Sequence, residues 1–170
     1  MRKLNIVSGN ILDYLSGIDA IVNSANKYMT SGSGVSGAIY KAANKEKLEA
    51  YCKENYRILM KTNEVRITPG FDLGIDIIHI YTPKFLKEKE PIQMLLDAYS
   101  ILLKVASEKG YKNIVTVSLG TGVHGYKHED VAKPVLGLIK DYLKHSDASF
   151  SITLVLSTED IRDLYINYLN

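Results

Sequence analysis

The sequence predicts an α/β fold: a three-layer α/β/α sandwich around a mixed, mostly parallel six-stranded sheet. Strand-like and helix-like segments alternate in the order βαβαββαβαβα, if a short helical turn after the first strand is counted. The run at residues 113–119 is almost continuously apolar, as in a strand that is covered on both faces. The 170 residues are 46% apolar, which is enough for one sizeable core. We therefore expect a single domain spanning residues 1–170.

The first half of the chain contains four of the expected strands. These are residues 3–9, 19–25, 64–70 and 76–82. The segment 11–16 predicts the short helical turn, and residues 35–56 carry apolar side chains at helical spacing, which predicts one helix. The last two strands are joined by a turn containing Pro69, Gly70 and Gly74.

The second half predicts three helices and two strands. The helices are residues 90–110, 128–145 and a last one that starts at 158–160, and the strands are residues 113–119 and 151–157. Pro91 suits the first turn of its helix and Gly110 the end of it. Pro134 either kinks the next helix or lies within its first two turns. Thr158, or the serine before it, is the expected N-cap of the last helix.

The composition excludes several classes of protein. Twenty-one basic and 19 acidic residues give a formal net charge of +2, so no dedicated nucleic-acid or membrane surface is indicated. Cys52 is the only cysteine, which rules out an internal disulfide. The apolar run near the N-terminus is too short for a signal peptide or a membrane span. We expect a cytoplasmic monomer.

Two glycine-rich loops each follow an apolar strand and precede a helix, at residues 27–37 and 118–127. In a sheet covered by helices, ligands bind outside the carboxyl ends of the strands, so both loops should lie at the same edge. Glycines let backbone N–H groups converge on an anion, and a helix N-terminus favours negative charge. Two such loops suit a diphosphate.

The first loop contains Gly32-Ser33-Gly34-Val35-Ser36-Gly37, which spells G-x-G-x-x-G. A dinucleotide-binding turn needs its first glycine directly after the strand, but the strand at 19–25 ends well before Gly32. A Walker loop is also excluded, because no Gly-Lys-Ser/Thr occurs. We interpret the loop as a phosphate-binding start of a helix and its spelling as coincidental.

Polar residues near these loops have more than one interpretation. Asn23 and Asn26 follow a buried strand, where their amides either bind sugar hydroxyls or cap local backbone. His124 and His128 do not have the spacing of a zinc protease, so no metal and no cofactor is expected. A triad built on Ser118 and His124 lacks a nucleophile elbow.

Six motifs in order resemble the macrodomain family, which binds ADP-ribose. They are GNIL (9–12), DAIVNSAN (19–26), SGSGVSGAIYKAA (31–43), TPGFDL (68–73), DIIHIYTP (76–83) and SLGTGVHGY (118–126). Together they cover essentially the whole chain. The resemblance implies the macrodomain fold and ADP-ribose, or an ADP-ribosylated acceptor, as the partner.

The resemblance also implies a set of site residues. Asn26 corresponds to the asparagine that contacts the distal ribose, and Asn10 and Ile11 to the positions that recognise the adenine edge. The first diphosphate loop corresponds to Gly32, Gly34, Val35 and Ser36. The second corresponds to Gly120, Thr121, Gly122, Val123, His124, Gly125 and Tyr126.

Four residues depart from the family pattern. Asn10 replaces the usual aspartate, Ser36 the aspartate of many hydrolytic members, Ser157 an aromatic that stacks on adenine, and His124 an aromatic of the late loop. Two functions follow. One is a hydrolase that removes ADP-ribose from a protein, nucleic acid or small molecule, with Asn26 orienting the sugar and His124 as acid/base. The other is a non-catalytic reader or sequestering module for ADP-ribose or a related nucleotide.

Overall fold

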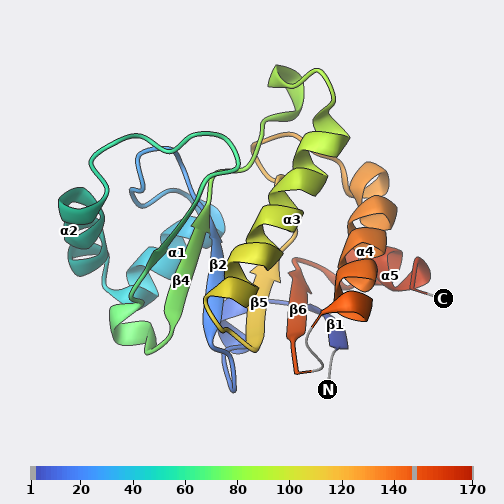
Figure 1. Ribbon diagram of the computed structural model, residues 1–170, viewed down its shortest axis with the longest axis horizontal. Coiled ribbons are helices and arrows are strands. Elements are labelled where there is room, and N and C mark those ends of the chain that lie inside the picture. Colours follow the sequence, from blue (N-terminus) through green and yellow to red (C-terminus); the bar gives the residue numbers. More distant parts are fainter. Residues whose placement is uncertain (1–2, 147–148, 170) are drawn as a thin grey trace.

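The sheet of the computed structural model has six strands in the order β1–β6–β5–β2–β4–β3 (Figure 1). The structure describes residues 3–146 and 149–169. The strands are β1 (Lys3–Ser8), β2 (Ala20–Ser24), β3 (Val65–Thr68), β4 (Asp76–Ile80), β5 (Asn113–Val117) and β6 (Ser151–Leu156). Only the pairing of β3 with β4 is antiparallel among these six, which confirms the predicted mixed, mostly parallel sheet.

Helices cover both faces of the sheet. The α-helices are α1 (Gly34–Ala43), α2 (Lys45–Asn55), α3 (Pro91–Glu108), α4 (His128–His145) and α5 (Glu159–Asn167), and the 3₁₀ helices are η1 (Ile11–Asp13), η2 (Phe71–Leu73) and η3 (Phe85–Lys87). One apolar core packs α3 and α4 against the sheet, and α5 extends that layer over β1 and β6. A second core packs α1 and α2 on the opposite face. The predicted three-layer sandwich is therefore confirmed.

The central strands are apolar on both faces because each face is covered. In β4, Ile77 belongs to the core beneath α1 and α2, whereas the next residue, Ile78, belongs to the core beneath α3 and α4. All four of the isoleucines Ile21, Ile77, Ile78 and Ile80 are fully buried. Two-sided burial explains why these strands read as continuous apolar runs.

The prediction of one helix over residues 35–56 is wrong, because this segment forms two helices. Asn44 separates α1 from α2 with a φ angle of 98° and ψ of 96°. Its backbone N–H ends α1 on the carbonyl of Tyr40, and its side-chain oxygen accepts from the backbone N–H of Lys47 in the first turn of α2. Asparagine tolerates positive φ and caps well, so one residue ends one helix and begins the next.

The remaining helix ends agree closely with the sequence. Pro134 lies inside α4, in its second turn, so the helix accommodates it near its start. Thr158 caps α5 by accepting from the backbone N–H of Ile161 at 3.3 Å. None of the helices in the described part of the chain is long and apolar enough to cross a membrane. The cytoplasmic location stays a prediction.

Candidate functional site

Five parallel strands end at the same edge of the sheet, and the candidate site residues follow those ends. Parallel pairing joins β1 to β6, β6 to β5, β5 to β2 and β2 to β4. The first glycine loop leaves β2 and the second leaves β5, which is its neighbour. The sequence prediction that both loops lie at one edge is confirmed. In open α/β sheets this edge is where ligands bind.

The side chain of Asn26 holds the first loop together. Its Nδ2 donates to the carbonyl of Thr30 at 2.8 Å, and its Oδ1 accepts from the backbone N–H groups of Tyr28 at 3.0 Å and Thr30 at 3.3 Å. Both ends of the amide thus bond to the loop itself, which is the local capping role that the sequence left open. Its contact with a ribose stays a prediction.

The turn into α1 brings Gly32 close to both Asn26 and Ser36. A Cβ atom on Gly32 would lie 3.6 Å from Ser36 Oγ and 4.0 Å from Asn26 Nδ2. Ser36 Oγ is buried and has no hydrogen-bond partner among the described residues. Val35, directly before it, is 39% exposed. The first turn of α1 therefore holds one buried hydroxyl that no described residue bonds to.

The second loop is fixed from beneath by tyrosine hydroxyls. The backbone N–H of Leu119 donates to the hydroxyl of Tyr99 in α3 at 2.8 Å, and the hydroxyl of Tyr126 donates to the carbonyl of Pro91 at 2.7 Å. Gly120 has a φ of 78°, and a Cβ there would lie 2.8 Å from the Tyr126 ring. Tyr126 is only 3% exposed, so its side chain supports the loop from inside.

The tip of the second loop is open. Val123 is 95% exposed, and Gly122 and Gly125 are exposed as well. Thr121, half-buried, donates from its hydroxyl to the carbonyl of Ser118 at 3.0 Å. The backbone N–H of Gly125 donates to the carbonyl of Gly122 at 3.1 Å, which closes the turn. Small residues at this tip suit the close approach of an anion.

His124 ties the second loop to the segment that follows β4. Its Nδ1 lies 2.8 Å from Thr82 Oγ1 and 3.2 Å from the carbonyl of Pro83, and its own carbonyl accepts from the backbone N–H of Phe85 at 2.8 Å. In the sheet, β2 lies between β5 and β4, so this contact joins the segments that follow the two neighbours of β2.

The protonation of His124 follows from these contacts. The carbonyl of Pro83 can only accept, so both contacts are satisfied together when Nδ1 carries a proton, which leaves the lone pair on Nε2. Burial lowers the pKa of His124 below its usual value, Lys84 also lowers it, and the bonds to Pro83 and Thr82 oppose the shift. The imidazole is therefore neutral at pH 7, with a basic nitrogen available.

The ends of β1 and β6 form the other end of the candidate site. These strands pair in parallel up to Ser8 and Leu156, so Asn10 and Ser157 follow neighbouring strand ends. Both side chains are exposed, whereas Ile11 is buried. The Oδ1 atom of Asn10 accepts from the backbone N–H of Leu12 at 3.0 Å. Because an N–H only donates, the capping atom is the oxygen, and the NH₂ group of Asn10 is left for other partners.

A buried polar chain supports the site from within the sheet. Asn23 donates from Nδ2 to His79 Nδ1 at 3.1 Å, and His79 Nε2 lies 2.9 Å from Thr68 Oγ1. An amide N–H can only donate, so the proton of His79 is on Nε2. Burial lowers the pKa of His79 to about 3, which keeps the ring neutral. Asn23 is fully buried, so its side chain does not reach a ligand at the surface.

The structure separates the residues of the two rejected sites. Within residues 3–146 and 149–169, no three His, Cys, Asp or Glu side chains gather in a metal-binding arrangement. The hydroxyl of Ser118 bonds to Tyr165 in α5 at 2.9 Å, and His124 bonds to Thr82 and Pro83 instead. Cys52 is buried, and burial raises the pKa of its thiol to about 11.

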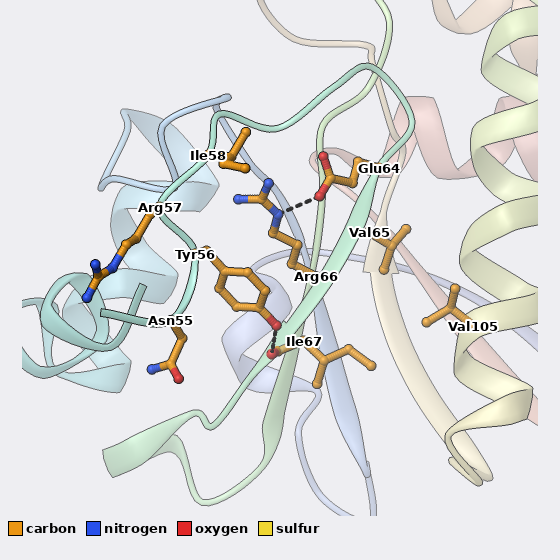
Figure 2. Close-up of a pocket in the computed structure, with 9 residues that line it drawn as sticks. All are labelled: Asn55, Tyr56, Arg57, Ile58, Glu64, Val65, Arg66, Ile67 and Val105. Atoms are coloured by element: carbon orange, nitrogen blue, oxygen red, sulfur yellow. Dashed lines mark hydrogen bonds and ion pairs between the residues drawn. The ribbon is translucent and has the colours of Figure 1, made fainter. Parts of the chain in front are cut away.

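A cavity of about 490 Å³ lies beside β3 (Figure 2), and no residue of the two glycine loops lines it. Its lining includes Tyr56, Arg57 and Arg66. Arg66 donates from Nε to Glu64 at 2.6 Å, and Figure 2 shows the Arg57 guanidinium directed away from Arg66. The two cations therefore do not converge on one ligand. This cavity does not match the predicted site.

Sequence reasoning missed the residues that hold the loops. Thr82, Tyr99 and Tyr165 belong to elements distant along the chain, yet each bonds to the second loop or to its first residues. Tyrosines within apolar helical stretches are read as core residues, and their hydroxyls carry no spacing signal. Only the fold shows where those hydroxyls point.

A parallel-sheet edge with two glycine loops defines a phosphate-binding α/β domain. The Macro domain family model matches residues 22–135, so the chain belongs to the macrodomain family. The predicted family is thereby confirmed.

Relatives and solved structures agree with this assignment. An O-acetyl-ADP-ribose deacetylase of Escherichia fergusonii is 32% identical over 96% of this chain and 93% of that protein. The Oceanobacillus iheyensis macrodomain with ADP has a TM-score of 0.86 at 31% identity, covering 98% of this chain and 89% of that one. The Trypanosoma brucei macrodomain in complex with ADP-ribose has a TM-score of 0.83 at 26% identity, covering 98% and 69%.

Proposed function

We propose that the chain binds ADP-ribose along the edge formed by the ends of β1, β6, β5 and β2, and hydrolyses a bond to its distal ribose. The observation that carries the proposal is that the two glycine loops follow neighbouring parallel strands at one edge of the sheet, where His124 of the second loop bonds to Thr82 and Pro83. The named ligands of the O. iheyensis and T. brucei macrodomains support ADP-ribose as the ligand. The names of the deacetylase relatives support hydrolysis.

The strand order supports one direction for the bound ligand. The diphosphate lies between the loops after β2 and β5, where backbone N–H groups are exposed by glycines. The distal ribose lies beside Asn26 and Ser36, next to His124. The adenosine then extends over β6 and β1, to Ser157, Asn10 and the backbone of Ile11.

The reaction is hydrolysis, in which water attacks and one bond to the leaving group breaks. His124 Nε2 takes a proton from water as its oxygen attacks the reacting carbon, and the same proton is then delivered to the leaving oxygen. With an O-acetyl ester, the acyl C–O bond breaks and acetate and ADP-ribose are released. With an ADP-ribosylated acceptor, the bond to the ribose anomeric carbon breaks instead. The small-molecule ester is the substrate that the names of the relatives favour.

The second candidate function is a module that binds ADP-ribose without turnover. Ser36 favours it, because a serine hydroxyl with no base beside it cannot activate water. Its Oγ is buried near Gly32 and has no partner among the described residues. In this alternative the loop binds the ligand through its backbone N–H groups, and Ser36 supplies no catalytic group.

The test combines calorimetry with a turnover assay. The protein is titrated with ADP-ribose and then incubated with O-acetyl-ADP-ribose and with an ADP-ribosylated protein. Binding with turnover that falls at least about 10²-fold in His124→Ala supports the hydrolase. Binding without turnover, with an affinity for ADP-ribose that His124→Ala does not change, supports the non-catalytic binding module instead. In that case Ser36→Asp, compared with Ser36→Asn as the uncharged control, shows whether one carboxylate creates activity.

A further inference from the structure

One hydroxyl group contacts both ends of the second glycine loop. Tyr165 lies in α5, and its hydroxyl is 2.9 Å from Ser118 Oγ and 2.9 Å from His128 Nδ1. Ser118 directly follows β5, where the loop starts, and His128 is the first residue of α4, where the loop has ended. Tyr165 is fully buried, so these partners are held against it.

Both partners of the Tyr165 hydroxyl are neutral. Burial lowers the pKa of His128, with Glu129 opposing the shift, and the tautomer of the imidazole decides whether its Nδ1 accepts from Tyr165 or donates to it. Burial raises the pKa of Tyr165 to about 12, and the bond with Ser118 opposes this shift. In either direction, the Tyr165 hydroxyl joins Ser118 to His128.

The geometry of the histidine ring supports a defined contact. The rings of His128 and Tyr165 meet edge to face, with centroids 5.7 Å apart and an interplanar angle of 75°. Ser118 is also bonded through its carbonyl to the hydroxyl of Thr121 in the loop. Displacement of Ser118 would thus be passed directly to the loop.

We propose that the Tyr165 hydroxyl is a positioning group that sets the spacing of the two ends of the second loop and so organises its backbone N–H groups for an anion. As far as it concerns ligand affinity, this inference rests on the proposed function. Tyr165 itself does not touch the ligand; it acts through Ser118 and His128. The consequence is that α5, which lies at the far end of the chain, determines the quality of the phosphate site.

We call the contacts of the Tyr165 hydroxyl with Ser118 and His128 the clamp. Tyr165→Phe tests it, because this variant removes one oxygen and keeps the buried ring. We expect amide hydrogen exchange across residues 120–125 to quicken about tenfold and affinity for ADP-ribose to fall about fivefold, in keeping with the loss of a buried hydrogen bond. Tyr142→Phe is the matched control. Its hydroxyl donates to the carbonyl of Leu103 at 3.1 Å, between α4 and α3. It should leave exchange in the loop and affinity unchanged.

Two further variants separate positioning from general destabilisation. His128→Ala should reproduce the faster exchange of Tyr165→Phe, and the double variant should be no worse than either single one. His128→Asn keeps an amide that can donate or accept near the position of Nδ1 and should restore most of the wild-type exchange. The inference is overturned if Tyr165→Phe and Tyr142→Phe give the same exchange across 120–125. If the wild type fails to bind ADP-ribose, the proposed function fails, and the exchange comparison still decides the clamp.

Discussion

The carbonyl oxygen of Gly32 lies 2.5 Å from the position that a Cβ atom on Gly37 would occupy. Real Cβ contacts of this length essentially never occur. The first loop can therefore fold back on the first turn of α1 only because Gly37 has no side chain. We interpreted the G-x-G-x-x-G spelling as coincidental, but its last glycine has a structural cause, unrelated to dinucleotide binding.

Gly37→Ala should damage the first loop. The added methyl group must displace the backbone carbonyl of Gly32, which is a part of the loop that cannot rotate away. We expect ADP-ribose affinity to fall at least about tenfold by calorimetry, since misplacement of binding groups by about 1 Å is costly. Gly137→Ala is the control, because a Cβ at that site in α4 meets nothing within 4 Å. Its free energy of unfolding should rise by up to about 1 kcal/mol, with unchanged affinity.

Asn10 should weaken recognition of adenine. Its oxygen already accepts from Leu12, which leaves an NH₂ donor at its free end. In the proposed binding mode this donor faces the amino group of adenine, which is also a donor. Asn10→Asp supplies an acceptor and should strengthen ADP-ribose binding by roughly tenfold. The inosine analogue of ADP-ribose, which carries an oxygen at that position, should lose affinity in the same variant. Equal changes for the two nucleotides would contradict this account of Asn10.

The pH dependence of turnover should report His124. Because burial and Lys84 lower its pKa, the imidazole is basic at pH 7, and kcat/KM should fall as the pH drops through that lowered pKa. Lys84→Met removes one of the causes and should move the acid limb to higher pH. His145, in the exposed last turn of α4, supplies the control. His145→Gln should leave the profile unchanged, and a profile that does not move in Lys84→Met would count against His124.

Stability should fall in acid because of His79. Its pKa is about 3 in the folded protein and about 6.5 when unfolded, so the unfolded state binds the proton first. The contribution of neutral His79 to the free energy of unfolding is fully present above pH 6.5 and is lost progressively as the pH falls toward 3. Urea unfolding between pH 6 and pH 5 should show a loss of about 1 kcal/mol. His79→Gln, although less stable at pH 7, should lose less over this interval, and an equal loss would contradict the assignment.

The sequence predicted the sheet and its site edge for physical reasons. Buried parallel strands are apolar on both faces, and the loops that follow them carry the glycines, so strand and loop patterns coincide. The break at Asn44 was missed because apolar spacing continues across it, and only its φ of 98° separates α1 from α2. Asparagine is a residue that tolerates such an angle, so the signal was present but weak.

The support of the site was less predictable than its location. Asn26 was expected at a ribose, and the structure shows its amide bonded to Thr30 and Tyr28. Tyr126 was expected at the ligand, yet its side chain is buried with its hydroxyl on Pro91. Such contacts depend on where side chains meet in three dimensions, which no local spacing encodes. Their roles toward a ligand stay predictions.

The most direct test is to follow backbone amide chemical shifts while ADP-ribose is added to the protein. We predict that the largest changes occur at residues 32–36 and 120–125, with smaller ones at Ile11 and Ser157, and that they saturate together as one binding event. Changes that instead gather around Tyr56 and Arg66, beside the cavity in Figure 2, would contradict the account. An unchanged spectrum would contradict it as well.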